Sequence, residues 1–233
     1  MKLKTENDLP ADENTFVFCS FQSMHKISKT SFYTWMKVMN QTPNSVLWLT
    51  NHKPDSKEQL ELRAEESGVD ASRLIFSPGV AAGLHLTRAQ ACDLMLDSWP
   101  YNAHSTATDA LWAGVPLLAY LPDYHDPNAE LQTPKMCSRV SASLLHTLGV
   151  NQLIQPTIDE FVSAAVQLAT DKALYKQVRD ALIERRMKSR LYNLVRYAQT
   201  HESAYEELFN RFKRGESPAP LNVADLREVD KKQ

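Results

Sequence analysis

The chain has 233 residues, 43% of them apolar, and its 26 basic and 28 acidic residues leave a formal net charge of −2. This length suits one α/β domain of ordinary size or two small ones, with a sizeable hydrophobic core. The scattered and nearly balanced charge excludes the basic surface typical of nucleic-acid-binding proteins, so we expect no nucleic-acid partner.

The two ends of the chain differ in composition from its middle. Residues 1–14 are polar and contain a proline, which predicts a linker. Residues 214–233 are rich in charge and proline, which predicts a flexible tail. The domain between them, residues 15–213, contains five short, almost continuously apolar runs that are typical of strands covered on both faces. These predicted strands are 15–21, 45–50, 73–78, 92–97 and 116–121.

Helical patterns separate the predicted strands. The pattern after the first strand has Ser28 or Thr30 as a candidate N-cap, and the pattern after the second runs from Ser56 to Gly68. After the fifth strand the pattern is wholly helical, over 138–148, 159–170, 172–188 and 197–212. Alternating strands and helices predict a doubly wound, Rossmann-like parallel sheet with a helical C-terminus. Ligands of such sheets bind beyond the carboxyl ends of the strands, which directs attention to the loops there.

The loops after the first and third strands carry basic side chains. Lys26 follows the first strand, where an ammonium group could meet a phosphate, and the alternative is a solvated loop lysine. His85 and Arg88 follow the third strand at a spacing of three, so they would share one helical face. The alternative for this segment is a flexible loop that leads into a surface helix.

The loop after the fourth strand holds the densest group of hydrogen-bonding side chains. We expect a short helix from Ser105 or Thr106 to 113, ended by Gly114 in the left-handed conformation. His104, Ser105 and Thr106 would lie at its N-terminus, where free N–H groups and the helix dipole favour a phosphate. Thr106 and Asp109 also have the spacing of a capping box, a structural alternative that leaves His104 and Ser105 unexplained.

Other site chemistries find little support in the sequence. The seven histidines form no HxxxH or HxH pair, and no DxD, GxSxG, P-loop or GxGxxG motif is present at a strand end. A phosphate would therefore be neutralised by side chains and backbone dipoles, and we expect neither a metal nor another cofactor.

The cysteines and the apolar runs bear on the compartment. Cys19, Cys92 and Cys137 are odd in number and far apart, and the first two lie in apolar runs where buried thiols are common. They predict a reducing compartment. No apolar run approaches the roughly 18–20 residues that span a bilayer, and the polar start lacks a signal-peptide pattern. We therefore expect a cytoplasmic or nuclear protein without a membrane partner.

Four segments together resemble a known family. They are NSVLWL (44–49), RLIFSP (73–78), LD followed by YNAHSTATDALWAGVP (101–116), and SRVSASLLHTLG (138–149). In this order they resemble the C-terminal catalytic lobe of the O-linked N-acetylglucosamine transferases and their SPINDLY-like relatives, over about residues 15–212. The resemblance implies the donor-binding lobe of a glycosyltransferase-B fold. It also implies transfer of a sugar from a UDP-sugar to Ser or Thr of intracellular proteins, with inversion and without a metal.

The resemblance also assigns roles to residues. The family's lysine that contacts the diphosphate and helps UDP to leave falls on Lys26, the catalytic candidate. The substrate-binding candidates are the family's histidine and arginine after the third strand, its phosphate-contacting His-Thr-Thr run and its ribose-contacting aspartate. They fall on His85, Arg88, His104, Ser105, Thr106 and Asp109.

The chain departs from the family in several places. A family glutamine is replaced by Ser23, although Gln22 stands beside it, and a family lysine is replaced by Ala82. The loop 123–136 is longer than its family counterpart, and it could gate the site or be simple surface. The family's other catalytic lobe and its tetratricopeptide array are missing, so the N-terminal lobe would be supplied in cis or in trans.

Three hypotheses follow. The first is the donor-binding half of a protein O-glycosyltransferase. The second is a non-catalytic nucleotide-sugar-binding or regulatory module, favoured by Ser23, Ala82 and the missing lobe. The third is an unrelated nucleotide-dependent enzyme such as a dehydrogenase, which the missing glycine fingerprint disfavours.

Overall fold

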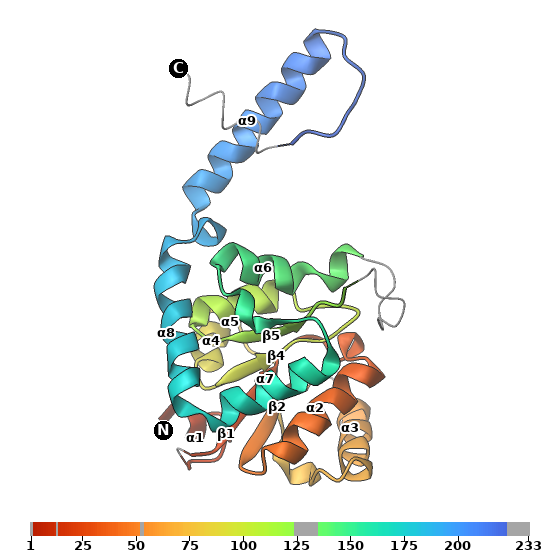
Figure 1. Ribbon diagram of the computed structural model, residues 1–233, viewed down its shortest axis with the longest axis vertical. Coiled ribbons are helices and arrows are strands. Elements are labelled where there is room, and N and C mark those ends of the chain that lie inside the picture. The colour runs from red at the N-terminus through yellow and green to blue at the C-terminus, as the bar shows by residue number, and fades with distance from the viewer. Residues whose placement is uncertain (1, 13, 52–53, 124–134, 223–233) are drawn as a thin grey trace. The chain divides into compact units, whose positions relative to one another are not determined.

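The computed structural model describes residues 2–12, 14–51, 54–123 and 135–222 (Figure 1). The chain divides into two compact units, Met1–Met187 and Lys188–Gln233. The boundary predicted from the sequence, between residues 213 and 214, separates the lobe from a C-terminal tail. The loop 123–136, for which the sequence left open a gate or simple surface, lies largely outside the described residues.

The first unit is built on a parallel sheet of six strands in the order β3-β2-β1-β4-β5-β6. This is the order of the doubly wound Rossmann fold, in which the chain reverses its direction of winding between β1 and β4. The fold prediction is therefore confirmed. The strands are β1 (Phe16–Ser20), β2 (Ser45–Asn51), β3 (Leu74–Pro78), β4 (Leu94–Leu96), β5 (Leu117–Tyr120) and β6 (Ile154–Gln155).

Five of these strands coincide with predicted ones to within a few residues, and β6 was missed. β6 has only two residues, which are half-buried and pair with the end of β5. It lies in the stretch that the sequence predicted as wholly helical, so that expectation was wrong at this point. A two-residue strand has no periodicity that could reveal it.

Helices cover both faces of the sheet (Figure 1). α2 packs against α7 on one face, and α4 packs against α5 on the other, as right-handed crossovers require. The helices of the first unit are α1 (Lys2–Thr5), α2 (Lys29–Gln41), α3 (Pro54–Glu66), α4 (Ala82–Ala89), α5 (Ser105–Ala113), α6 (Val140–Leu148), α7 (Ile158–Thr170) and α8 (Lys172–Lys188). The second unit contains α9 (Leu194–Lys213), an amphipathic helix without buried residues.

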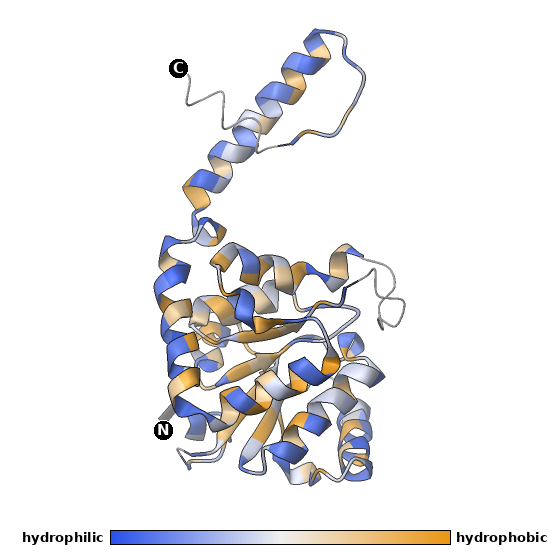
Figure 2. Cartoon of the chain, in the orientation of Figure 1, coloured by the Kyte–Doolittle hydropathy of each residue, from blue (hydrophilic) through white to orange (hydrophobic). Residues whose placement is uncertain are grey.

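The core lies between the strands and the helices. In Figure 2 the strands are coloured mainly as hydrophobic residues, while the helices carry both hydrophobic and hydrophilic residues. Every side chain of β4 and β5 is buried, which explains their continuous hydrophobicity in the sequence. Local signals act as predicted: the Ser28 hydroxyl caps α2 by accepting the Ser31 N–H at 3.1 Å, and Gly114 ends α5 at φ +82°.

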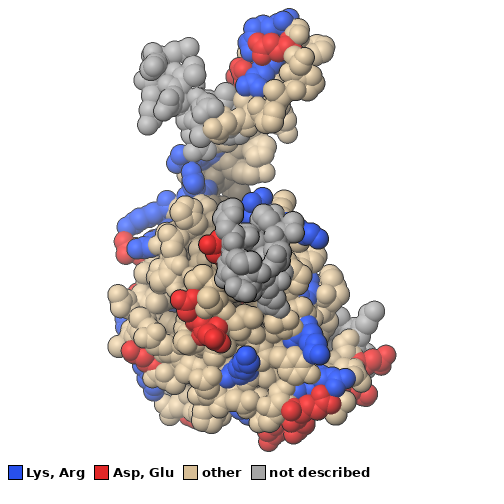
Figure 3. Space-filling view, turned by 45° about the vertical axis from the view of Figure 1, so that its right-hand side comes forward, with Lys and Arg blue, Asp and Glu red and all other residues tan. Residues whose placement is uncertain are grey.

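On the face of the molecule shown in Figure 3, Lys and Arg side chains lie among Asp and Glu side chains without a continuous basic patch. None of the helices in the described ranges is long and apolar enough to cross a bilayer.

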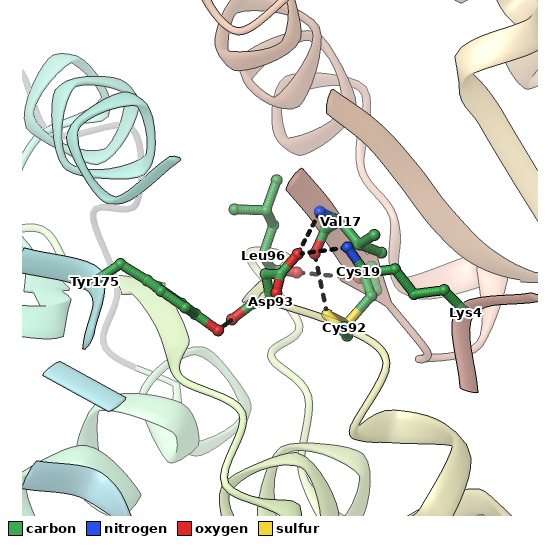
Figure 4. Close-up of a disulfide and its surroundings, with 8 residues drawn as sticks. Lys4, Val17, Cys19, Cys92, Asp93, Leu96 and Tyr175 are labelled. Atoms are coloured by element: carbon green, nitrogen blue, oxygen red, sulfur yellow. Dashed lines mark hydrogen bonds and ion pairs between the residues drawn. A yellow bond between two sulfur atoms is a disulfide. The ribbon is translucent and has the colours of Figure 1, made fainter. Parts of the chain in front are cut away.

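The N-terminal segment differs from the predicted linker. Lys4 Nζ donates to Thr15 O at 2.8 Å and lies 3.7 Å from an oxygen of Asp93, while Leu9 is only 4% exposed. The Asp93 carboxylate also accepts the Val17 N–H at 2.8 Å. This segment therefore packs against β1 and the start of β4 (Figure 4).

The cysteines correct a second expectation. Cys19 and Cys92 form a disulfide, with their Cα atoms 5.9 Å apart (Figure 4). Only Cys137 is a free, half-buried thiol. The expectation of three thiols was wrong because β1 and β4 are neighbours in the sheet, so a separation of 73 residues does not keep these cysteines apart in space. This removes the cysteine argument for a reducing compartment.

Candidate functional site

The loops that follow β1 and β4 meet at the carboxyl end of the sheet, where the winding reverses. Lys26 Nζ donates to the Asn102 carbonyl at 3.1 Å and lies 4.0 Å from the centre of the Tyr101 ring. Ile27 and Pro100 form an antiparallel bridge between the same two loops. Lys26 is therefore a half-buried, engaged side chain and not the solvated loop lysine of the alternative interpretation.

The start of α5 is open to a ligand. The helix begins at Ser105, as predicted, and its N-cap is His104, whose side chain makes no capping hydrogen bond. The first bond is from Thr108 N–H to His104 O at 3.1 Å, and the preceding three N–H groups have no partner among the described residues. Ser105 is exposed, and neither its hydroxyl nor that of Thr106 is hydrogen-bonded within the described chain. An anion would find backbone donors, hydroxyls and the positive end of the helix dipole here.

The capping-box interpretation of Thr106 and Asp109 is wrong. Thr106 lies inside α5 as its second residue, so it cannot be the N-cap. Where the helix begins depends on the conformation of the preceding loop. The four-residue spacing of Thr106 and Asp109 carries no information about that conformation. With this alternative removed, His104, Ser105 and Thr106 are the side chains that the structure brings to the open helix N-terminus.

Asp97 anchors the loop between β4 and α5. Its carboxylate is fully buried and accepts the Ala103 N–H at 2.7 Å. On the other side of this loop, the Ser141 hydroxyl donates to Ala103 O at 3.1 Å. Burial raises the pKa of Asp97 to about 7, against the opposing effects of its hydrogen bonds and of the positive charge of Lys26.

The same burial acts in the opposite sense on Lys26. Loss of hydration lowers the pKa of the Lys26 ammonium, and the ionised forms of Asp97 and Cys137 would oppose this effect. The sequence analysis named Asp97 only as the end of a strand. The sequence did contain a feature that points to Asp97. It is an aspartate at the end of an apolar strand, on the edge of the sheet where ligands bind.

His85 and Arg88 lie on α4 and not in a flexible loop. Arg88 is 7% exposed, donates to Pro78 O at 2.7 Å, and lies over the Phe21 ring at 5.4 Å. The His85 ring lies 5.3 Å from the same Phe21 ring. Burial, followed by the charge of Arg88, lowers the pKa of His85, whereas Asp109 acts to raise it. Arg88 therefore fastens α4 to the end of β3, and His85 lies against Phe21, just after β1.

Buried polar atoms without a hydrogen-bond partner gather at this edge of the sheet. Such atoms are rare in folded proteins, and those that occur often mark functional sites. Among the described residues that have one here are Gln22, Thr50, His85, Arg88 and His104. Gln22 is 2% exposed, so the candidate replacement for the family's glutamine is a buried amide, while Thr50 was missed by the sequence analysis.

A groove of about 730 Å³ flanks the loop that carries Lys26. Its walls are this loop, through Ser23, Met24 and His25, and one side of α3, through Ser56 and Gln59. Ser23 therefore lines open space. Within the described ranges there is no group of three or more His, Cys, Asp or Glu side chains that could hold a metal ion.

The first unit is a doubly wound α/β lobe, and the start of α5 at its switch point is a candidate site for an anion. The chain belongs to glycosyl transferase family 41, whose sequence model matches residues 1–201. The resemblance stated from the sequence is therefore confirmed.

Relatives agree with this assignment. The chain is 31% identical over 212 residues to a UDP-N-acetylglucosamine–peptide N-acetylglucosaminyltransferase of Caenorhabditis elegans, covering 91% of this chain and 17% of that protein. It is 31% identical over 216 residues to a Hordeum vulgare protein named "Probable UDP-N-acetylglucosamine–peptide N-acetylglucosaminyltransferase SPINDLY", covering 90% of this chain and 22% of that protein. The chain thus spans about a fifth of the length of these relatives.

A solved structure shows the same fold. A mutant O-GlcNAc transferase of Thermobaculum terrenum superposes with a TM-score of 0.73 at 23% identity, over 85% of this chain and 36% of that one. At this identity the superposition supports the fold, while the roles of individual residues rest on the geometry described above.

Proposed function

We propose that this chain is the donor-binding half of a protein O-glycosyltransferase, which binds a UDP-sugar such as UDP-N-acetylglucosamine. The observation that supports this best is the start of α5, where the first three N–H groups have no partner among the described residues. It lies at the switch point of the sheet, next to the Asn102 carbonyl that accepts a hydrogen bond from Lys26. The names of the relatives supply the donor and the peptide acceptor as candidates. Transfer would go to Ser or Thr of a protein, with inversion at the sugar.

The mechanism is electrostatic. The diphosphate would accept hydrogen bonds from the N–H groups at the start of α5, from the hydroxyls of Ser105 and Thr106 and from the His104 imidazole. Lys26 would stabilise the negative charge that develops as UDP leaves. These groups supply the positive field that a metal provides in other transferases, so the reaction would need none.

The nucleoside part would lie toward α4. Asp109 on α5 would accept a hydrogen bond from the ribose, and His85 on α4, which packs against α5, would lie near the same part of the nucleotide. Arg88 already donates to Pro78 O. Its proposed contribution is therefore to hold the junction of β3 and α4 in place beneath the nucleoside.

The other half of the cleft would come from an N-terminal catalytic lobe, in cis or in trans. That lobe would provide the rest of the acceptor site. On the family's account, the proposed compartment is the cytoplasm or nucleus. Thiol labelling of the denatured protein from cells would test the compartment. A reducing compartment predicts three labelled cysteines, whereas a formed Cys19–Cys92 disulfide leaves only Cys137 to react.

Calorimetric titration with UDP, GDP and NAD tests the binding site. We expect selective UDP binding that is lost in the double variant Lys26→Ala, His104→Ala. The matched control is Lys37→Ala, His146→Ala, which removes an exposed lysine and an exposed histidine from elsewhere on the same unit. UDP binding that survives in the first variant, or tight NAD binding, would refute the proposal.

A non-catalytic binding module is the second candidate. It is favoured by Ser23 and by the buried amide of Gln22, because the glutamine of the family pattern is displaced by one residue. The decisive experiment adds a family N-terminal lobe and an acceptor peptide to the UDP-binding chain. Sugar transfer would support the first candidate, and binding without transfer would support the second.

A further inference from the structure

Tyr101 contacts the Lys26 ammonium but has no role in the proposed function. It is 40% exposed, although it stands in the loop that anchors the site. Lys26 Nζ lies 4.0 Å from the centre of its ring. The next residue, Asn102, offers the carbonyl that accepts the Lys26 hydrogen bond at 3.1 Å. Two consecutive residues of one loop therefore hold the same ammonium group.

We propose that Tyr101 is a positioning residue that holds the Lys26 ammonium beside the N-terminus of α5 through its ring face. This inference rests on the proposed function of Lys26 and names what keeps that group in place. Tyr101 would act through Lys26 and would not itself react.

The geometry of the ammonium supports this role. A lysine ammonium has three donors, and the Asn102 carbonyl takes one of them. The ring face at 4.0 Å occupies a second side, where the π-electron density attracts the positive charge. This leaves part of the ammonium free for a phosphate oxygen. A flexible side chain is thus restricted before the ligand arrives, which lowers the entropic cost of binding.

The tyrosine ring is itself held. The centre of the Tyr101 ring lies 5.2 Å from that of the His104 ring. It lies 6.3 Å from the centre of the His25 ring, which belongs to the loop after β1. His104 is the N-cap of α5, so the ring links the lysine to the helix start. An exposed aromatic side chain in contact with two histidines and a lysine is better explained by this link than by core packing.

The first test reads Lys26 without any nucleotide. The protein is labelled with ¹³C at the Cε atoms of its lysines. The Lys26 resonance is the one that disappears in Lys26→Arg. The pH titration of that resonance gives the pKa of the Lys26 ammonium. The titratable groups that act on this ammonium are Asp97 and Cys137, and His25 and His104 lie against the Tyr101 ring. Tyr101→Phe should leave the titration unchanged, because the ring face remains. Tyr101→Leu should lower the pKa of Lys26 further, because the leucine side chain excludes water without attracting the charge.

The second test is UDP affinity. Tyr101→Leu should weaken UDP binding about fivefold to thirtyfold, the range that a partly desolvated cation–π contact predicts, whereas Tyr101→Phe should stay within about twofold. Fluorinated phenylalanines at position 101 should weaken binding progressively, since fluorine withdraws the π density while preserving shape. The matched control is Tyr33→Leu, which removes the ring beside Lys29 at 5.8 Å and should leave UDP affinity unchanged.

The outcomes separate this inference from the proposed function. A Lys26 titration that is identical in wild type and Tyr101→Leu would overturn the positioning role. An unchanged UDP affinity across the fluorinated series would overturn it as well. A shifted titration together with no UDP binding by any variant would support the hold on Lys26 and refute the proposed function.

Discussion

The buried carboxyl group of Asp97 should make the stability of the first unit depend on pH in a defined direction. The perturbation is Asp97→Asn, which preserves an oxygen that can accept the Ala103 N–H and removes the titrating group. The carboxyl group is fully buried, and its pKa is raised from 3.8 to about 7, mainly by burial.

The sign follows from proton binding. Between about pH 4 and pH 7 the unfolded chain has lost the Asp97 proton, while the folded chain still holds it. The folded state therefore binds more protons, and its stability falls as the pH rises through this window. Below it both states are protonated, and above it both are ionised. The difference between 3.8 and about 7 corresponds to roughly 4 kcal/mol of lost stability.

Urea unfolding at pH 4, 5, 6 and 7 measures this effect. Tryptophan fluorescence reports on the correct unit, because all four tryptophans lie within Met1–Met187. The stability of Asp97→Asn relative to wild type should increase from pH 4 to pH 7 by up to roughly 4 kcal/mol. Glu58→Gln, at an exposed position of α3, is the control that should run parallel to wild type. Parallel curves for Asp97→Asn as well would refute a buried carboxyl group with a raised pKa.

Three further predictions concern the site, the disulfide and a helix end. Lys26→Ala should lower turnover of the assembled transferase about 100-fold, or around 3 kcal/mol, and wild-type turnover would refute its role. Replacing Cys19 and Cys92 by Ala should cost about 4 kcal/mol more unfolding free energy under oxidising conditions than under reducing ones, because the bridge closes a loop of 73 residues. Gly114→Ala should cost about 1 kcal/mol or more in urea unfolding, because φ is +82° and a Cβ atom would come within 3.2 Å of Ile183. Gly83→Ala, which meets open space, should not destabilise the protein.

Much of the fold could be predicted because its signals are local. Five strands were found from apolar runs, since a parallel sheet covered on both faces requires continuous hydrophobicity. The start of α5 at Ser105 and its end at Gly114 were also predicted, from hydroxyl side chains and from a glycine that tolerates positive φ. The candidate site residues were taken from the loops at the carboxyl ends of the strands, which parallel strands bring to one edge of the sheet, and their roles were taken from the family resemblance.

The remaining features depend on contacts between distant segments. The Cys19–Cys92 disulfide arises from strand adjacency and not from spacing. Lys26 contacts Tyr101 and the Asn102 carbonyl, and Lys26 and Asn102 are 76 residues apart in the sequence. No local pattern specifies which carbonyl a lysine will reach, so these contacts could not be predicted from sequence.

The two shifted pKa values at the switch point have one functional consequence. An ionised Asp97 would attract Lys26 and compete with a diphosphate for its positive charge. Burial of Asp97 opposes this competition, since the carboxyl group retains its proton up to about pH 7. Burial of Lys26 also lowers the pKa of its ammonium, so Lys26 gains more from an incoming anion than a hydrated lysine would. The Asn102 carbonyl and the Tyr101 ring hold the ammonium without neutralising it. Within the proposed function, the site thus keeps a positioned positive charge for the phosphate oxygens.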